Sequence, residues 1–292
     1  MKILVTGASG FLGSHVADAL SSAGHQVVVF DHVSSAYLRS DQEFVTGDIL
    51  NADLVVKAVA GCDAVYHMAA IADIGAAMDN PRQTLNVNLI GTLNMLEAAR
   101  EAGIKRFVFS SSIYVYSSQG SFYRTSKQAC EHLIQDYQDR FGIDYTILRF
   151  GSLYGPRAGE TNAVYRMLCQ ALTDNRIDYG GTGAEIREYI HVLDAAAMSV
   201  DILDPSFSNQ IIHLTGRERM TTRDLLELIK EMMGGHIEIG LDDGHFAGHY
   251  VQTPYSYVPK LGRRMTRNTY IDLGLGLLDC LQSMDPRREQ DS

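Results

Sequence analysis

The stretch Thr6-Gly7-Ala8-Ser9-Gly10-Phe11-Leu12-Gly13 decides the fold of this chain. Three apolar residues before it predict a short strand, and the apolar spacing over about 11–23 predicts a helix that includes its last residues. Gly7 permits a tight turn, Gly10 lets the backbone approach a pyrophosphate, and Gly13 lets the helix pack closely on the strand. The N–H groups at the start of the helix are suited to binding phosphates. A plain tight turn is the alternative interpretation.

A carboxylate follows the next predicted strand, which spans 27–30. Asp31 stands where a side chain accepts both ribose hydroxyls of an adenosine, and its charge would repel a 2′-phosphate. His32 is not the basic residue that usually marks NADP preference, so we expect NAD as the cofactor. Asp48 and Ile49 follow a weaker strand and are expected at the adenine edge; an ordinary loop acid is the alternative. The expected cofactor contacts in this part of the chain are Gly7, Gly10, Phe11, Leu12, Gly13, Asp31, Asp48 and Ile49.

Short apolar runs alternate with helical patterns over the first 150 residues. The expected strands lie at 3–5, 27–30, 43–45, 64–66, 107–109 and 145–148, and the helices between them span about 11–23, 51–60, 82–102 and 123–141. In the third helix, one face is expected to pack on the sheet because apolar residues recur at spacings of three and four, at Leu89, Leu93, Leu96 and Ala99. The alternation predicts an α/β fold with a doubly wound parallel (Rossmann) sheet.

The regular alternation ends after Gly155-Pro156. The segments expected beyond it are helices near 162–175, 192–204 and 222–233, a glycine-rich turn at 180–183 and a strand at 211–214, with Thr221 or Thr222 as the N-cap of the last helix. We predict an NAD-binding Rossmann domain at 1–160 plus about 188–215, and a smaller mixed α/β substrate domain at about 161–187 and 216–284. The charged tail 285–292 is expected to be disordered.

Composition excludes several classes of protein. The chain has 292 residues, 46% of them hydrophobic, and no apolar run long enough to span a membrane. Its net charge of −10 and the absence of a basic block argue against nucleic acid as a partner. No signal peptide is recognisable, so we expect a cytoplasmic protein. Without CxxC spacing, no metal site or disulfide framework is expected from the four cysteines, Cys62, Cys130, Cys169 and Cys280.

The candidate chemistry lies between a serine-tipped strand and the next helix. Ser110 to Ser112 end the strand at 107–109, and Tyr123 and Lys127 stand four residues apart on one helical face. A neighbouring ammonium, together with the positive nicotinamide of NAD, is expected to lower the pKa of Tyr123 toward use as a general base. Tyr123 then takes a hydroxyl proton while hydride leaves the same carbon, and Ser112 holds that hydroxyl. A helical tyrosine beside a surface lysine is the alternative interpretation.

These motifs, taken in order, resemble the extended short-chain dehydrogenases, specifically the NAD-dependent epimerase/dehydratase family that acts on nucleotide sugars. The matching segments are TGASGFLG at 6–13, GDIL at 47–50, HMAA at 67–70, NVNLIGTLN at 86–94, SSSIYVYS at 110–117, YRTSK at 123–127, RFGSLYGP at 149–156 and REYIHVLD at 187–194. The resemblance implies that Met68, Ala69, Ala70, Asn88 and Ser110 line the cofactor groove. It also implies that Arg187 reaches the substrate diphosphate and that two long helices per subunit pair into a homodimer.

Departures from the family pattern narrow the expected reaction. Where the family's 4,6-dehydratases have Thr-Asp-Glu, this chain has Ser112, Ile113 and Tyr114, and Tyr114 also replaces the glutamate of the sugar-acid decarboxylases. Dehydration and decarboxylation are therefore disfavoured. Epimerisation through a transient ketone, or plain oxidation or reduction, remains.

Further departures concern the substrate. Tyr123 follows Ser112 by only 11 residues, which predicts an unusually open site. Ser152 stands where the family commonly has an asparagine that touches the substrate. The family's Arg-x-Gly-Asp segment is missing, and either Arg263 or Arg264 could replace its arginine; solvated basic residues are the alternative.

The sequence therefore predicts an NAD-dependent nucleotide-sugar epimerase acting at C4 through a 4-keto intermediate. An NAD(H)-dependent dehydrogenase or 4-keto reductase acting on a similar nucleotide sugar is the first alternative. A non-catalytic protein that senses the NAD/NADH ratio is the second, although intact Tyr123 and Lys127 argue against it.

Overall fold

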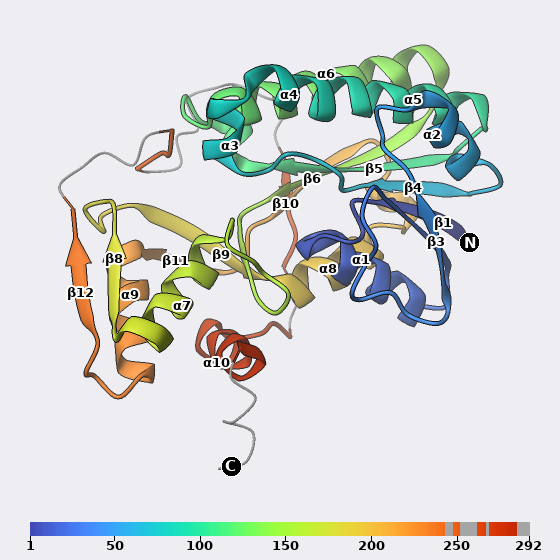
Figure 1. Ribbon diagram of the computed structural model, residues 1–292. Coiled ribbons are helices and arrows are strands. Elements are labelled where there is room, and N and C mark those ends of the chain that lie inside the picture. Colours follow the sequence, from blue (N-terminus) through green and yellow to red (C-terminus); the bar gives the residue numbers. More distant parts are fainter. Residues whose placement is uncertain (243–247, 252–261, 267–268, 285–292) are drawn as a thin grey trace.

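Eight parallel strands form the central sheet of the computed structural model, which describes residues 1–242, 248–251, 262–266 and 269–284 (Figure 1). The strand order is β13-β10-β6-β5-β4-β1-β2-β3. These strands are β1 Lys2–Thr6, β2 Gln26–Asp31, β3 Gln42–Thr46, β4 Ala64–His67, β5 Arg106–Ser112, β6 Asp144–Phe150, β10 Gln210–Leu214 and β13 Arg263–Arg264. Every pair of neighbours in this order is parallel. The doubly wound parallel sheet is confirmed; the predicted tail 285–292 lies outside the described residues.

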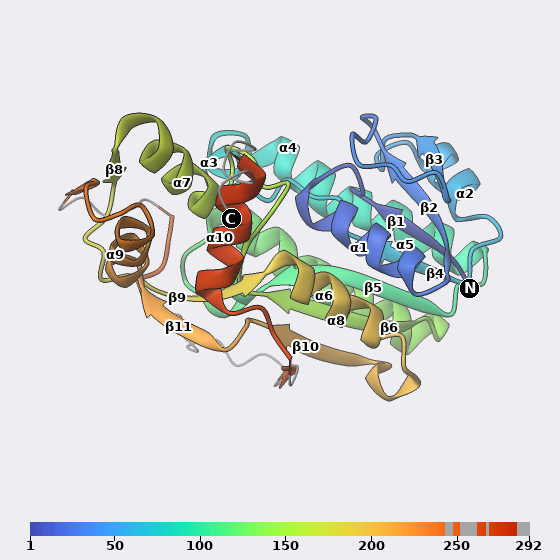
Figure 2. The same ribbon diagram turned by 90° about the horizontal axis from the view of Figure 1, so that it is seen from below.

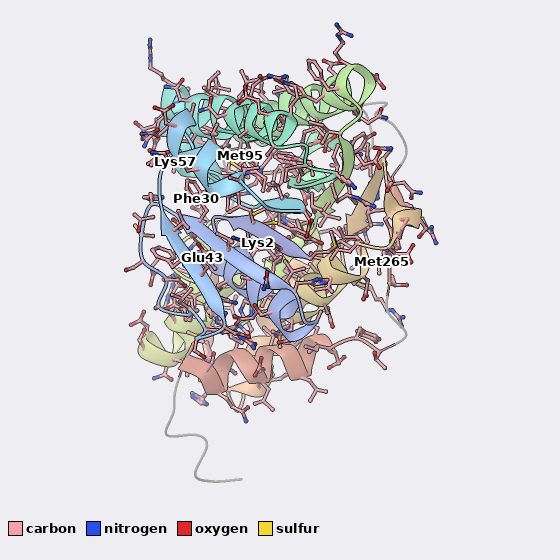
Figure 3. The ribbon with its side chains drawn as sticks, turned by 90° about the vertical axis from the view of Figure 1, so that its right-hand side faces the viewer. Lys2, Phe30, Glu43, Lys57, Met95 and Met265 are labelled. Carbon is pink, nitrogen blue, oxygen red and sulfur yellow. The ribbon has the colours of Figure 1, made fainter. Side chains whose placement is uncertain are left out.

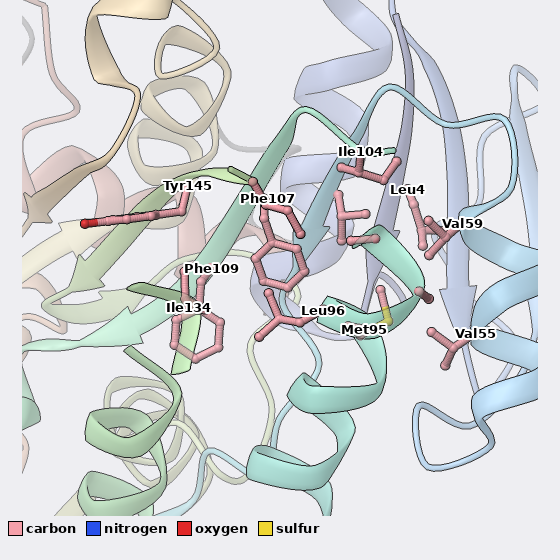
Figure 4. Close-up of a cluster of buried hydrophobic side chains, with 14 of the residues drawn as sticks. Leu4, Val55, Val59, Met95, Leu96, Ile104, Phe107, Phe109, Ile134 and Tyr145 are labelled. Carbon is pink, nitrogen blue, oxygen red and sulfur yellow. The ribbon is translucent and has the colours of Figure 1, made fainter. Parts of the chain in front are cut away.

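Helices cover both faces of this sheet (Figures 1 and 2). On one face lie α1 Phe11–Ser22 and α8 Val192–Asp201; on the other lie α2 Ala52–Val59, α5 Gly91–Glu101 and α6 Ser121–Phe141. The strands are buried on both faces, which is why they are almost continuously apolar. Figure 4 shows Phe107 and Phe109 of β5 against Leu96 of α5 and Ile134 of α6. Figure 3 views the sheet from its β3 edge, with Phe30 and Met95 in the same core cluster.

The single helix predicted over 82–102 is interrupted. It consists of α4 Pro81–Leu85, a π-helical turn at Asn86–Ile90 and α5, and a separate short helix, α3 Ile74–Asp79, precedes it. At the π turn the backbone oxygen of Asn88 accepts hydrogen bonds from the Thr92 hydroxyl at 2.5 Å and the Cys130 thiol at 3.1 Å. Periodicity alone does not reveal such a turn, because the extra residue is accommodated by side chains from other segments.

The remaining elements gather around a separate apolar cluster that includes Leu168, Ile177, Leu226 and Leu277. They are the three-stranded sheet β11 Glu218–Thr221, β9 Ile186–His191 and β7 Ser152–Tyr154, the parallel pair β12 Glu238–Leu241 and β8 Arg176–Tyr179, and the helices α7 Ala163–Asp174, α9 Thr222–Met232 and α10 Leu273–Met284. Of the two candidate N-caps, Thr221 is the one used, in a capping box with Asp224. Five of these strands and α10 were not predicted; β13 in the central sheet was also missed. The domain boundaries stay a prediction.

Replacing Gly13 tests the contact between α1 and the first turn. A β-carbon there would lie 2.2 Å from the backbone oxygen of Gly7, so the helix must move. Gly13→Ala is expected to lower the free energy of unfolding by about 3 kcal/mol, measured by chemical denaturation. The matched control is Gly159→Ala, because a β-carbon there meets nothing within 4 Å. An equal, small effect of both substitutions would contradict the close packing.

Candidate active site

The first turn leaves a cradle between β1, α1 and the end of β4. Gly7 has φ +67°, and a β-carbon on it would lie 2.6 Å from the Ala69 nitrogen. Gly10 caps α1 without a side chain, so no side-chain oxygen occupies the start of the helix. Backbone N–H groups there suit a pyrophosphate. The residues present therefore fit a dinucleotide.

The Asp31 carboxylate is held at the end of β2, next to this cradle. It is 8% exposed and accepts hydrogen bonds from the backbone N–H groups of Ser9 at 3.0 Å and Val33 at 3.3 Å. Its position suits a ribose diol. Of the two residues expected at the adenine edge, Ile49 turns its side chain into the core, whereas Asp48 is exposed and caps a turn by accepting from Leu50 N at 2.9 Å.

Lys127 and Tyr123 are brought to the carboxyl end of β5, as the spacing predicts. The Lys127 ammonium donates to the backbone oxygen of Ser110 at 2.6 Å and lies 4.7 Å from the ring centroid of Phe109. Its distance to the ring centroid of Tyr123 is 5.8 Å. Burial lowers the pKa of Lys127 to about 8.

The expected lowering of the Tyr123 pKa is not produced by the protein's own groups. Burial raises the pKa of Tyr123 to about 12, and a hydrogen bond with Ser112 only partly opposes this. Lys127 does not reverse the effect because its ammonium is itself buried and donates to Ser110 rather than to the phenol. The positive nicotinamide of NAD is the remaining charge that favours a phenolate here.

A buried hydrogen-bond chain supports both halves of the site. His67, 1% exposed, lies 2.7 Å from the Thr6 hydroxyl through Nδ1 and 3.0 Å from the Thr92 hydroxyl through Nε2. Since Thr92 donates its proton to the Asn88 backbone oxygen, Nε2 must be the donor to Thr92, and Nδ1 accepts from Thr6. Burial lowers the pKa of His67 to about 3, which agrees with a neutral ring. His67 opens the HMAA segment at 67–70, but that motif did not indicate this role for it.

Asn88 links that chain to the catalytic helix. Its side chain accepts from Ile71 N at 2.7 Å and donates to Ile71 O at 3.0 Å and to the Ser126 hydroxyl at 2.9 Å. Ser126 in turn donates to the backbone oxygen of Tyr123 at 2.7 Å. Met68 and Ala69 follow β4, and their backbone N–H groups donate to the backbone oxygen and the hydroxyl of Thr6, each at 3.2 Å. The Asn88 side chain is engaged in holding neighbouring segments.

A buried ion pair lies behind β5, and sequence reasoning missed it. Arg149, 1% exposed, donates to both oxygens of Glu131, at 2.9 and 2.5 Å. Ser111 donates to the same carboxylate at 2.5 Å. The acid nearest along α6 to the catalytic pair is therefore engaged by Arg149 and Ser111.

The predicted substrate residues meet on the small sheet. Ser152 of β7 pairs with Tyr189 of β9, the strand that also carries Arg187, and the Arg187 guanidinium lies 4.4 Å from the ring centroid of Tyr250. The two arginines considered as replacements are engaged elsewhere. Arg263 lies 5.7 Å from the ring centroid of Phe207, and Arg264 donates to the backbone oxygen of Gly216.

The short loop between Ser112 and Tyr123 predicts an unusually open site. This prediction is wrong at the end of the loop that lies near Tyr123. Residues 248–251 lie against it: Gly120 N donates to Gly248 O at 2.8 Å, and the ring of Tyr250 packs against that of Tyr114 with centroids 4.6 Å apart and planes at 51°. The loop length alone could not show this, because the covering segment comes from far along the chain.

Two expected absences can be compared with the described part of the chain. Within it, no group of His, Cys, Asp or Glu side chains is arranged to hold a metal ion. Among its helices, none is long and apolar enough to cross a bilayer.

The sheet, its glycine turn and the serine, tyrosine and lysine at one edge define a short-chain dehydrogenase of the extended type. A family profile described as "NAD dependent epimerase/dehydratase family" matches residues 3–213. The chain belongs to this family, and NAD is its cofactor.

Known proteins similar to this chain include both epimerases and dehydratases. A Methanocaldococcus jannaschii protein named putative UDP-glucose 4-epimerase is 28% identical over 253 residues, covering 80% of this chain and 82% of that protein. A Mycobacterium tuberculosis dTDP-glucose 4,6-dehydratase is 31% identical over 235 residues, covering 70% and 69%. The crystal structure of Bacillus cereus UDP-glucuronic acid 4-epimerase with UDP-glucuronic acid and NAD has a TM-score of 0.85 at 26% identity, covering 97% and 99%.

Removing the Thr92 hydroxyl tests the buried chain. Thr92→Val leaves the His67 Nε2–H without an acceptor and is expected to lower the free energy of unfolding by about 1–3 kcal/mol, measured by denaturation. Thr92→Ser keeps the hydroxyl and serves as the control, with a smaller loss expected. A serine variant as unstable as the valine variant would contradict the assigned chain.

Neutralising Asp31 tests its role in cofactor choice. Asp31→Asn removes the charge that repels a 2′-phosphate, so the ratio of NADP to NAD affinity, measured by calorimetry, is expected to rise about 10-fold or more. Asp139→Asn is the control, because it removes the same charge from an exposed residue of α6. An unchanged ratio in Asp31→Asn would remove Asp31 from the ribose site.

Proposed function

We propose that this chain is an NAD-dependent epimerase that inverts C4 of a nucleotide sugar through a 4-keto intermediate. The observation that supports this most is that Ser112 and Tyr123 are hydrogen-bonded at the end of β5, with Lys127 beside them and no free carboxylate on the turn after Ser112. With bound NAD as the hydride acceptor, these groups suffice for the removal of a proton and a hydride at one carbon.

Ser112, Tyr123 and Lys127 have separate roles in the proposed proton transfer. Ser112 orients the C4 hydroxyl, and Tyr123 removes its proton, while bound NAD would supply the acceptor for the C4 hydride. Lys127 holds positive charge near the phenol. After the ketose turns in the pocket, Tyr123 gives the proton back to the C4 oxygen as hydride arrives on the opposite face.

Elimination of water is disfavoured by the groups beside Ser112. Ile113 and Tyr114 stand where an acid and a base are needed, and burial raises the pKa of Tyr114 well above its usual range. Glu131 is held by Arg149 and Ser111. The same absence of an acid disfavours decarboxylation, although dehydratases and decarboxylases are among the similar proteins.

The remaining site residues keep the roles expected of them. We propose that Arg187 and Ser152 contact the substrate and that α5 and α6 pair two copies into a homodimer. The proposed cofactor contacts are Gly7, Gly10, Phe11, Leu12, Gly13, Asp31, Asp48, Ile49, Met68, Ala69, Ala70, Asn88, Ser110, Tyr123 and Lys127.

Product analysis tests the proposal directly. NAD-loaded protein is incubated with UDP- and GDP-hexoses, and NMR is expected to show the C4-inverted sugar. Tyr123→Phe is expected to lower kcat about 10²- to 10⁴-fold, because the phenol oxygen carries the proton. Tyr165→Phe is the matched control, a tyrosine of α7 outside the site.

The outcome separates the alternatives. An epimerase regenerates its cofactor in each turnover, so tightly held NAD is expected after purification. A 4-keto or otherwise oxidised product formed together with an equal amount of NADH would instead show a dehydrogenase. Consumption of NADH in equal amount to a 4-keto sugar would show a reductase. Undiminished function of Tyr123→Phe would contradict any catalytic role for this residue.

A further inference from the structure

Two tyrosines on the turn after Ser112 have different surroundings. In the 3-10 turn Ile113–Tyr116, the Tyr116 hydroxyl accepts from buried Arg149 at 2.6 Å and lies 2.6 Å from His213 Nε2. Tyr114 instead lies beside Tyr123, with ring centroids 6.3 Å apart and planes at 74°. Its side chain is only partly buried. Tyr114 therefore borders the place where Tyr123 and Ser112 are expected to hold the reacting hydroxyl.

His249, which lies 135 residues farther along the chain, holds the Tyr114 hydroxyl in place. The phenol oxygen lies 2.7 Å from His249 Nδ1. Backbone hydrogen bonds hold this segment at both ends, from Gly120 N to Gly248 O at 2.8 Å and from Ile186 N to Val251 O at 2.9 Å. The hydrogen-bonded pair of Tyr114 and His249 is thus already positioned by the protein.

The pair carries no net charge near neutral pH. Burial raises the pKa of Tyr114 well above its usual range, and burial together with the positive charge of Arg187 lowers the pKa of His249 to about 4. A phenol and a neutral imidazole form hydrogen bonds with an alcohol, whereas they offer a carboxylate no charge of their own in return for its lost hydration. The guanidinium of Arg187, the residue proposed to bind the diphosphate, packs on the ring of Tyr250.

The contacts run in a line from the proposed C4 position toward the proposed diphosphate position. Tyr114 lies next to Tyr123, Tyr250 packs against Tyr114, and Arg187 packs on Tyr250. A sugar with its C4 hydroxyl at Tyr123 and its diphosphate at Arg187 must pass along Tyr114. This step rests on the proposed function.

We propose that Tyr114 and His249 form a specificity-determining pair that binds a hydroxyl of a neutral hexose and disfavours a uronic acid. The probes are UDP-glucose and UDP-glucuronate with NAD-loaded enzyme. Wild type is expected to have at least about 10-fold higher kcat/KM for UDP-glucose. Tyr114→Phe keeps the ring and its packing contacts and is expected to reduce that ratio about 3- to 10-fold.

Further variants separate recognition from folding. His249→Leu is expected to reduce the ratio like Tyr114→Phe, and the double variant no further, because the two side chains act as one unit. His249→Lys supplies a cation and is expected to shift the ratio toward UDP-glucuronate. Tyr116→Phe is the matched control: it removes the hydroxyl between Arg149 and His213 and is expected to leave the ratio unchanged while lowering the melting temperature.

Each result decides one of the two proposals. Preference of wild type for UDP-glucuronate, or a Tyr114→Phe ratio equal to that of wild type, would overturn the recognition pair. If neither of these sugars nor any other UDP- or GDP-hexose is epimerised, the proposed function fails. The pair is then judged by the Kd values of both sugars, measured by calorimetry on the same NAD-loaded proteins, for which the same changes in ratio are expected.

Discussion

The close approach of α1 to the first turn is the constraint on which the rest of the molecule depends. A β-carbon at Gly13 would lie 2.2 Å from Gly7 O, and one at Gly7 would lie 2.6 Å from Ala69 N. These contacts aim the start of α1 at the carboxyl edge of the sheet. Because all the central strands are parallel, the carboxyl ends of β2, β4 and β5 lie at that same edge. Asp31, Ala69 and Ser112 stand at or just after these ends. The cofactor cradle and the reacting groups therefore follow from one packing requirement.

The residues that the sequence reveals are those whose signals are local. The glycine turn, Asp31 after an apolar strand, and Tyr123 four residues before Lys127 each fall within one short window, and the structure brings them together. Buried parallel strands are also recognisable because they are apolar on both faces. The sequence therefore predicts the central sheet, apart from β13, and the catalytic edge.

What the sequence does not reveal depends on pairing between distant segments. The strands β7, β9 and β11 are short and become strands by pairing with one another. The π turn at Asn88 depends on Thr92 and Cys130, and the covering of the short loop depends on Gly248 and Tyr250. The pKa of Tyr123 was expected to be lowered by Lys127, but burial affects both groups, and the net effect is visible only once their surroundings are known.

The buried chain from Thr6 through His67 and Thr92 to Asn88 runs in one direction, each hydroxyl or ring nitrogen giving its proton to the next acceptor. A substitution at either hydroxyl or at the ring leaves a donor or an acceptor facing an apolar core. These positions can therefore change readily only in compatible combinations. For the evolution of the protein, this means that few single substitutions are tolerated in the interior beneath the active site.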